Sequence, residues 1–378
     1  MGRHVSGNCP ELDRLVDDAC AEMGREIDSL CIPRLAGVVL GGGYGRGEGG
    51  VKEKLEARVG VGETIDKFHS STPTQNSNSE LQLKTPTPTL SNDLDFFAIT
   101  EDGVPEQETI TAIGEALKPV SEKWTTKLGV DVDFAVKIPW RLKHDEERIM
   151  VQELVRGYFD VAGKKGEELF SGIAKIDAAK LPWMEAARLM MNRGMGLLFA
   201  QERGTGNGER GTGNGERIPR AKRAPEAAQC GVGTVEFVNR NINKCILGVG
   251  DAFLVSRGLY CWRVEERAAA LAAQGDNGLY ARAVEWKFRP AEEPVCDLET
   301  AREAWLDGYM EVIAAVGDDD YSRTLRNAAR WLVRRRSIGE IRTFALNPVV
   351  RILESVKRHI RDRAAPDDSL MRDWEIFN

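Results

Sequence analysis

The sequence predicts an α+β protein in which a small mixed sheet with flanking helices precedes a mostly helical region. Apolar runs with strand character occur at 36–40, 92–100 and 129–138, and helical periodicity separates them. Beyond this part of the chain, long amphipathic patterns dominate. A change from strands to helices is typical of a sheet domain followed by a helical one. We therefore divide the chain into domains 1–145 and 146–378.

The composition is that of an ordinary globular protein, with 42% hydrophobic and 29% charged residues among 378. A net charge of -7 disfavours a general nucleic-acid binder. Basic residues cluster at 334–336 and 357–363, which form either a positive face or a solvated helix surface.

The seven cysteines form no CxxC pair, which predicts reduced thiols. No secretory signal is visible and no apolar run approaches the roughly 18 residues of a membrane span. We therefore expect a cytoplasmic protein without a membrane partner.

In the first domain, apolar residues recur at three- and four-residue spacing over 10–32, which predicts a helix. A short strand, 36–40, then runs directly into the glycine-rich stretch 41–50, "GGGYGRGEGG". A second helix is expected over 105–127, between the two later strands. In the second domain, amphipathic patterns predict helices over 147–158, 182–202, 236–256, 263–273, 298–316 and 321–336.

Two segments have the composition of flexible loops. Residues 66–91 are rich in Ser, Thr, Pro, Asn and Gln and have little apolar surface to bury, so we expect a flexible insertion across 51–91. The heptad "ERGTGNG" occurs twice in tandem, at 202–208 and 209–215. Two glycine-rich copies are too short for a solenoid, so we interpret 202–228 as a flexible loop.

The strand at 92–100 carries the pattern Asp-Leu-Asp. A strand places Asp93 and Asp95 on one face, where two buried carboxylates would repel each other. A hard divalent cation such as Mg²⁺ removes that penalty, because it takes carboxylate oxygens as ligands. The strand at 129–138 repeats the pattern with Asp131 and Asp133. If the two strands are neighbours, three or four carboxylates converge, as in two-metal phosphoryl-transfer sites. The alternative for the first pair is that Asn92-Asp93 caps a turn and Asp95 faces water.

The glycines fit such a site. A triphosphate needs close backbone approach and N–H donors, which a Gly-Gly turn at the end of the first strand supplies. Arg46 is placed to add a charge-assisted contact to phosphate. In the helical domain, Lys244 interrupts an apolar helix and is a candidate to hold the triphosphate tail, the alternative being a lysine at a helix edge. For Arg193, an ion pair with an acid such as Asp251 competes with substrate contact.

Together, "LGGGYGRGE", "NDLDFF" and "VDVDF" resemble the nucleotidyltransferase superfamily related to DNA polymerase β. The resemblance covers about residues 30–138. It implies a nucleotidyltransferase-like sheet, a Gly-Gly turn followed by Arg-Gly, a metal-binding Asp pair and a third metal-binding Asp. The matching residues are Gly42, Gly43, Arg46, Gly47, Asp93 and Asp95, with either Asp131 or Asp133, preferably Asp133, as the third acid. In the family a short turn joins the glycines to the acids, whereas here the 51–91 insertion intervenes.

The activity implied is Mg²⁺- or Mn²⁺-dependent transfer of a nucleoside monophosphate from a nucleoside triphosphate to a hydroxyl acceptor, with release of pyrophosphate. We expect ATP as the nucleotide and a small molecule or a protein as the acceptor. The acidic charge balance disfavours RNA.

Two other interpretations remain. The chain could be a non-catalytic nucleotide-binding or regulatory module of the same fold, although such modules typically lose metal ligands and here every acid is present. A dinucleotide-binding oxidoreductase of the Rossmann type is favoured only by Gly45, Gly47 and Gly50, which satisfy GxGxxG. That fold also needs a second parallel strand, and the Ser/Thr/Pro-rich run stands in its place.

Overall fold

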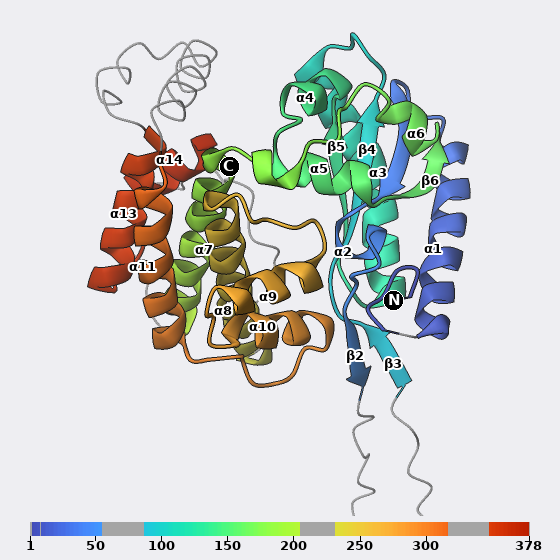
Figure 1. The fold of residues 1–378 in the computed structure, drawn as a ribbon. Helices are drawn as coiled ribbons and strands as arrows, with labels where there is room; N and C mark the ends of the chain where they lie inside the picture. Colours follow the sequence, from blue (N-terminus) through green and yellow to red (C-terminus); the bar gives the residue numbers. More distant parts are fainter. Residues whose placement is uncertain (1, 8, 55–86, 205–230, 317–347, 378) are drawn as a thin grey trace, which may run out of the picture.

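A computed structural model describes residues 2–7, 9–54, 87–204, 231–316 and 348–377. Figure 1 shows two parts side by side: a sheet part at the N-terminal end and a helical part beyond it. The protein is therefore of the mixed α+β type, as predicted. The predicted helix at 321–336 and all but the first residues of the predicted repeat loop lie outside the described residues.

The main sheet has four strands in the order β5-β4-β1-β6. β1 (Leu35–Leu40) is antiparallel to both β4 (Leu94–Thr100) and β6 (Phe159–Gly163), and β4 is parallel to β5 (Val132–Lys137). The three predicted strands and the mixed sheet are confirmed. β6 was not predicted, so the sheet continues beyond residue 145, where we expected the helical domain to begin. A first strand with antiparallel neighbours on both sides also differs from the parallel sheet that dinucleotide binding requires.

Helices cover both faces of this sheet (Figure 1). α1 (Pro10–Ser29) and α3 (Glu106–Leu128) pack on one face, and α4 (Pro139–His144) and α5 (Ile149–Arg156) pack on the other. β4 follows the alternation of a strand. Its buried Leu94, Phe96 and Ala98 join the core under α1 and α3, so Asp95 points to the α5 face.

Three short elements and a ribbon complete the sheet part. α2 (Gly42–Gly45) follows β1, α6 (Gly166–Leu169) follows β6, and a 3₁₀ turn (Ala178–Lys180) leads to the helical part. β2 (Val51–Lys54) and β3 (Thr87–Leu90) pair as an antiparallel ribbon. The two ends of the predicted flexible insertion are therefore ordered strands, and residues 55–86 between them lie outside the described residues.

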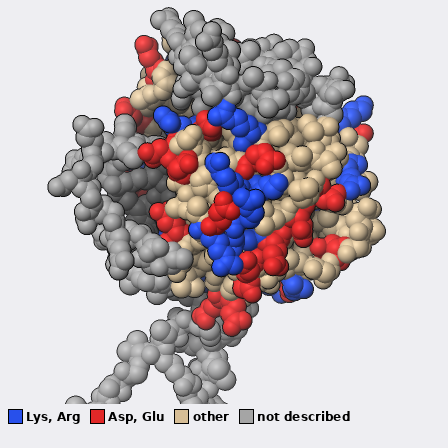
Figure 2. Space-filling model, turned by 90° about the vertical axis from the view of Figure 1, so that its left-hand side faces the viewer, with Lys and Arg blue, Asp and Glu red and all other residues tan. Residues whose placement is uncertain are grey.

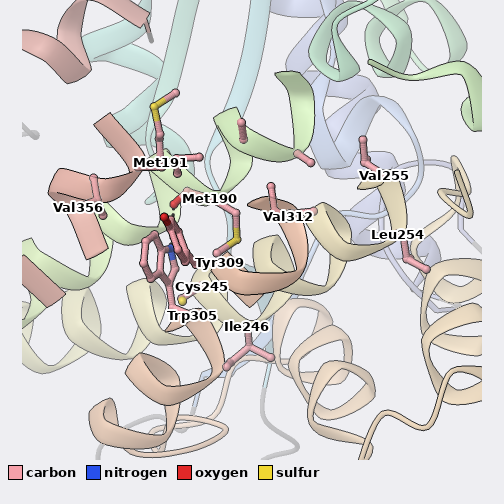
Figure 3. Close-up of a cluster of buried hydrophobic side chains, with 14 of the residues drawn as sticks. Met190, Met191, Cys245, Ile246, Leu254, Val255, Trp305, Tyr309, Val312 and Val356 are labelled. Carbon is pink, nitrogen blue, oxygen red and sulfur yellow. Dashed lines mark hydrogen bonds between the residues drawn. The ribbon is translucent and has the colours of Figure 1, made fainter. Parts of the chain in front are cut away.

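The helical part consists, within the described residues, of α7 (Trp183–Gly204), α8 (Gly231–Ser256), α9 (Val264–Ala273), α10 (Leu279–Phe288), α11 (Leu298–Ala314), α13 (Pro348–Asp362) and α14 (Asp368–Phe377). Figure 3 shows its core, where the Trp305 ring stacks on Tyr309 beside Met190. The Trp305 indole N–H donates to the Met190 carbonyl at 2.9 Å, so this buried polar atom is satisfied. The core fixes α7, α8 and α11 relative to one another.

The basic cluster at 357–363 lies at the C-terminal end of α13. Figure 2 shows the face that carries α13, with cationic and anionic side chains interleaved. Arg361 pairs with Asp362 at 2.9 Å, Lys357 lies 3.8 Å from Glu354, and Arg363 reaches Glu299 at 3.0 Å. This surface is a solvated helix face of mixed charge.

No helix within the described ranges is long and apolar enough to cross a membrane.

Tyr44 ties the glycine turn (residues 41–50) to the start of β4. Its side chain is 1% exposed, and its hydroxyl donates to the Gly50 carbonyl at 3.0 Å. The same oxygen accepts the N–H groups of Ser91 at 3.3 Å and Asn92 at 3.4 Å. One buried hydroxyl therefore fixes the backbone that leads into Asp93.

We predict that Tyr44→Phe destabilises the protein by about 1–3 kcal/mol, because it leaves buried backbone groups without a partner. Urea denaturation measures the change. Tyr158→Phe is the matched control, since no hydrogen bond of its hydroxyl is found within the described residues. Equal stability of the two variants would contradict the role assigned to Tyr44.

Candidate functional site

A cleft of about 300 Å³ lies between the sheet part and the helical part. The sheet part lines it with Gly43, Tyr44, Asp93 and Asp95, and the helical part closes it with side chains from α7, α8, α9 and α10. Because both parts contribute walls, the cleft exists only while the two parts stay docked.

Parallel pairing brings the predicted acids together. Asp95 and Asp133 are direct partners in the β4–β5 register, so their side chains share one face of the sheet. The pKa of Asp95 is raised to about 6, first by burial and then by the charges of Asp93 and Asp133. Burial, followed by Asp131 and Asp93, also raises the pKa of Asp133. The carboxylate of Asp95 nevertheless stays accessible from the cleft. Of the two candidates for a third acid, Asp133 is therefore the register partner of Asp95.

The acids do not form a complete metal cage. Within the part of the chain that the structure describes, no group of three or more His, Cys, Asp or Glu side chains is placed to hold a metal ion. The predicted convergence of three or four carboxylates on a metal is thus not seen, and of the four predicted aspartates only Asp93 and Asp95 line the cleft. This does not conflict with Mg²⁺, which proteins usually bind through one or two carboxylates plus substrate phosphates and water.

Gly42 places the glycine turn against this acid pair. Its φ of 59° lies in the left-handed region, and a Cβ at this position would overlap the Asp95 carboxylate. The preceding residue is also held against this strand, because the Gly41 N–H donates to the Asp95 carbonyl at 2.8 Å. Glycine is required here for both backbone conformation and space, and its neighbour Gly43 lines the cleft as predicted.

Cationic side chains face the acids from the helical part. Arg240 on α8 reaches Asp93 at 3.4 Å. Lys244, one turn further along α8, is accessible in the cleft, although the dense protein around it and the charge of Arg193 lower the pKa of its amine. Arg193 on α7 lies across Gly248, and its buried Nε has no hydrogen-bond partner among the described residues. The cleft therefore has an acidic wall on the sheet side and a cationic wall on the helical side.

Arg193 does not form the ion pair considered for it. Asp251 pairs instead with Arg267 at 3.0 Å and accepts the Tyr280 hydroxyl at 2.6 Å. Asp251 is close enough to favour the charged form of Arg193, but burial dominates and lowers the pKa of that guanidinium. The result is a cation without a direct carboxylate partner within the described ranges.

Arg46 lines the cleft, where two carboxylates contact it. Its guanidinium pairs with Glu153 at 3.1 Å and with Glu48 at 3.2 Å, so two carboxylates balance its charge. Glu48 is 3% exposed and also pairs with Lys287 of α10 at 3.1 Å. Its other oxygen accepts the Val264 N–H at 3.3 Å. These cations hold the pKa of Glu48 at about 2 despite its burial. Arg46 and Glu48 thus join the glycine turn to the helical part.

Sequence reasoning missed Arg240, Lys287 and Glu48. The sequence did contain an indication for Arg240: it lies four residues before Lys244, so the two side chains share one face of the helix. For Glu48 the indication was weaker: it is an acidic residue within a glycine-rich turn. Lys287 had none, because its role depends on a contact with a residue 239 positions away.

No protein-family model matches the chain, and no curated protein or solved structure matches it either. The functional assignment therefore depends on the geometry of the cleft and on the three short motifs.

We predict that Gly42→Ala destabilises the fold by about 1–3 kcal/mol and also displaces the Asp95 carboxylate. Gly103→Ala is the matched control, since Gly103 has a φ of 72° and a Cβ added to it would meet nothing within 4 Å. Both variants should lose stability in urea, but only Gly42→Ala should weaken binding of Mn²⁺-ATP in calorimetry. Unchanged Mn²⁺-ATP affinity in Gly42→Ala would contradict the contact.

Replacing Glu48 should change the pH dependence of stability. The folded pKa of about 2 lies below the ordinary 4.5, so ionised Glu48 stabilises the fold above pH 4.5, and this contribution is lost as pH falls towards 2. The shift corresponds to about 3 kcal/mol at neutral pH. Glu48→Gln should therefore be less stable than wild type at pH 7, with the difference in the free energy of unfolding shrinking between pH 4.5 and 2 in urea denaturation.

Glu101→Gln, on an exposed side chain, is the control and should change stability by less than about 0.5 kcal/mol. A pH-independent difference for Glu48→Gln would contradict this account.

Proposed function

We propose that the protein is a nucleotidyltransferase that moves a nucleoside monophosphate from a nucleoside triphosphate, with ATP as the expected donor, to a hydroxyl acceptor. One observation supports this most strongly: a pair of carboxylates, Asp93 and Asp95, faces the cationic side chains Arg193 and Lys244 across a single cleft. A metal–triphosphate complex carries both charges needed to match these walls. The resemblance of the glycine turn and the acid pairs to the polymerase β-related superfamily agrees with this assignment.

The acid pair suits a divalent cation. Burial and the charges of Asp93 and Asp133 raise the pKa of Asp95, so a cation bound beside this carboxylate would favour its ionised form. Asp93 and Asp95 would hold Mg²⁺ or Mn²⁺ together with phosphate oxygens, and Asp133 would support Asp95 from the neighbouring strand. The bound cation would neutralise negative charge on the phosphates during transfer.

The helical part would bind the phosphate tail. Lys244 is accessible from the cleft, and Arg193 offers an Nε without a described partner. Both are partly desolvated, which strengthens their attraction for an anion. Gly43 leaves room for close backbone approach at the opposite wall. These residues would hold the α-phosphate near the acids and the β- and γ-phosphates near the cations.

The proposed transfer is in line. The acceptor oxygen forms a bond to the α-phosphorus, the bond between that phosphorus and the α–β bridging oxygen breaks, and pyrophosphate leaves with the electron pair. A carboxylate of the site takes the hydroxyl proton. Such a reaction depends mainly on positioning and electrostatics, which rigid strands and docked helices provide.

We predict metal-dependent release of pyrophosphate from ATP by the purified protein in the presence of an acceptor. Asp93→Asn and Asp95→Asn should reduce the rate by at least about 100-fold, because they remove charge that holds the cation. Lys244→Gln should raise the KM for ATP by about 10-fold, since a charged hydrogen bond contributes roughly 1.5–3 kcal/mol. A coupled pyrophosphate assay with ATP titrations measures both effects.

Asp102→Asn and Lys118→Gln are the controls, since both side chains are exposed and away from the cleft. Equal pyrophosphate release by wild type and Asp95→Asn would refute the assignment. Tight Mg²⁺-ATP binding without any pyrophosphate release would instead favour the non-catalytic, nucleotide-binding alternative.

A further inference from the structure

A second cavity, of about 530 Å³, shares Arg46 and Glu153 with the cleft. The N-terminal segment, the glycine turn, the junction of α5 and β6, and the loop before α9 all contribute to it. We call it the basic basin, because its charged lining consists mainly of cations: Arg3, Arg46, Arg156, Lys175 and Arg263. Tyr158 and Trp262 supply its aromatic surface.

The two carboxylates of the basin do not balance this charge. Glu48 is already paired with Arg46 and Lys287, and Glu153 lies 3.1 Å from Arg46 and 3.7 Å from Arg267. Both carboxylates are therefore already engaged in the ion pairs that connect the two parts of the molecule. Arg3 is itself paired with Asp17 at 3.1 Å, so the cations of the basin that have no carboxylate partner among the described residues include Arg156 and Lys175.

Arg156 is held in place by several neighbours. Its guanidinium donates to the Gln152 side chain and carbonyl and to the Ile176 carbonyl, and it stacks on the Trp262 ring at 4.1 Å. These bonds do not use all five N–H donors of a guanidinium. It has no carboxylate partner within the described ranges, and burial lowers its pKa. Arg156 is thus a cation fixed by neutral groups.

A fixed guanidinium beside a second cation is suited to an anion with several oxygens. Arg recognises phosphate through two parallel N–H bonds, and holding its plane in advance reduces the entropy lost on binding. Lys175 lies exposed at the rim of the same basin. The volume of about 530 Å³ lies within the roughly 300–1,000 Å³ typical of small-molecule pockets.

We propose that the basic basin binds the phosphate group of a small phosphorylated acceptor whose hydroxyl reaches past Arg46 and Glu153 into the cleft. This proposal rests on the proposed transfer reaction. It explains why the basin and the cleft share a wall, and it narrows the acceptor to phosphorylated alcohols. The reaction is the one given above, with the acceptor hydroxyl forming the new bond to the α-phosphorus.

The binding test uses calorimetry with inorganic phosphate and ribose 5-phosphate on the full-length protein. Arg156→Gln should weaken the affinity for both by about 10-fold or more, and Lys175→Gln should weaken it less. Lys118→Gln should leave it unchanged, because this exposed side chain lines neither cavity. Circular dichroism and urea denaturation check that Arg156→Gln is folded. Unchanged affinity in both basin variants would overturn the proposal.

The turnover test compares ribose 5-phosphate with ribose as acceptor in the pyrophosphate assay. Arg156→Gln should raise the KM for ribose 5-phosphate and leave the KM for ATP unchanged, whereas Lys244→Gln should do the reverse. Equal use of ribose and ribose 5-phosphate by wild type would overturn the acceptor role. Arg156-dependent phosphate binding without any pyrophosphate release would support the anion site while refuting the transfer reaction. A short RNA that displaces ribose 5-phosphate with at least 10-fold higher affinity would overturn the assignment to a small molecule.

Discussion

The buried carboxylate of Glu48 holds the glycine turn between the two parts of the molecule. A carboxylate that is 3% exposed is tolerated only when charged partners surround it, and here they come from both sides. Arg46 contacts it from the turn itself, while Lys287 and the Val264 N–H contact it from the helical part. Because this network sets how α9 and α10 approach the glycine turn, the width of the cleft depends on it.

The cleft keeps like charges together on each wall. On the sheet side, Asp93 and Asp133 add to the effect of burial and raise the pKa of Asp95. On the helical side, Arg193 adds to the effect of burial and lowers the pKa of Lys244. Both shifts mean that the charged forms are disfavoured in the protein alone. A ligand that brings a cation to one wall and phosphates to the other relieves both penalties, which is the physical basis of the proposed function.

The parts of this structure that depend on local patterns could be predicted from the sequence. Alternation of acids and apolar residues predicted β4 and β5, and helical periodicity predicted α1, α3 and α7. β6 was missed because a strand of five residues is too short to show a clear alternation of apolar and polar residues. The partners of Arg46 were missed because Glu153 is far away in sequence, and pairing across parts of a fold leaves no local signal. Of the site, the acids and the glycine turn were predictable, and the cationic wall only through Lys244.

In the proposed complex, the acidic and cationic walls bind opposite ends of one metal–triphosphate. A crystal structure with Mg²⁺ and a non-hydrolysable ATP analogue tests this most directly. We expect the metal on Asp93 and Asp95 and the terminal phosphates against Lys244 and Arg193. A nucleotide bound elsewhere, or one bound in the cleft with its phosphates turned away from both walls, would contradict the account.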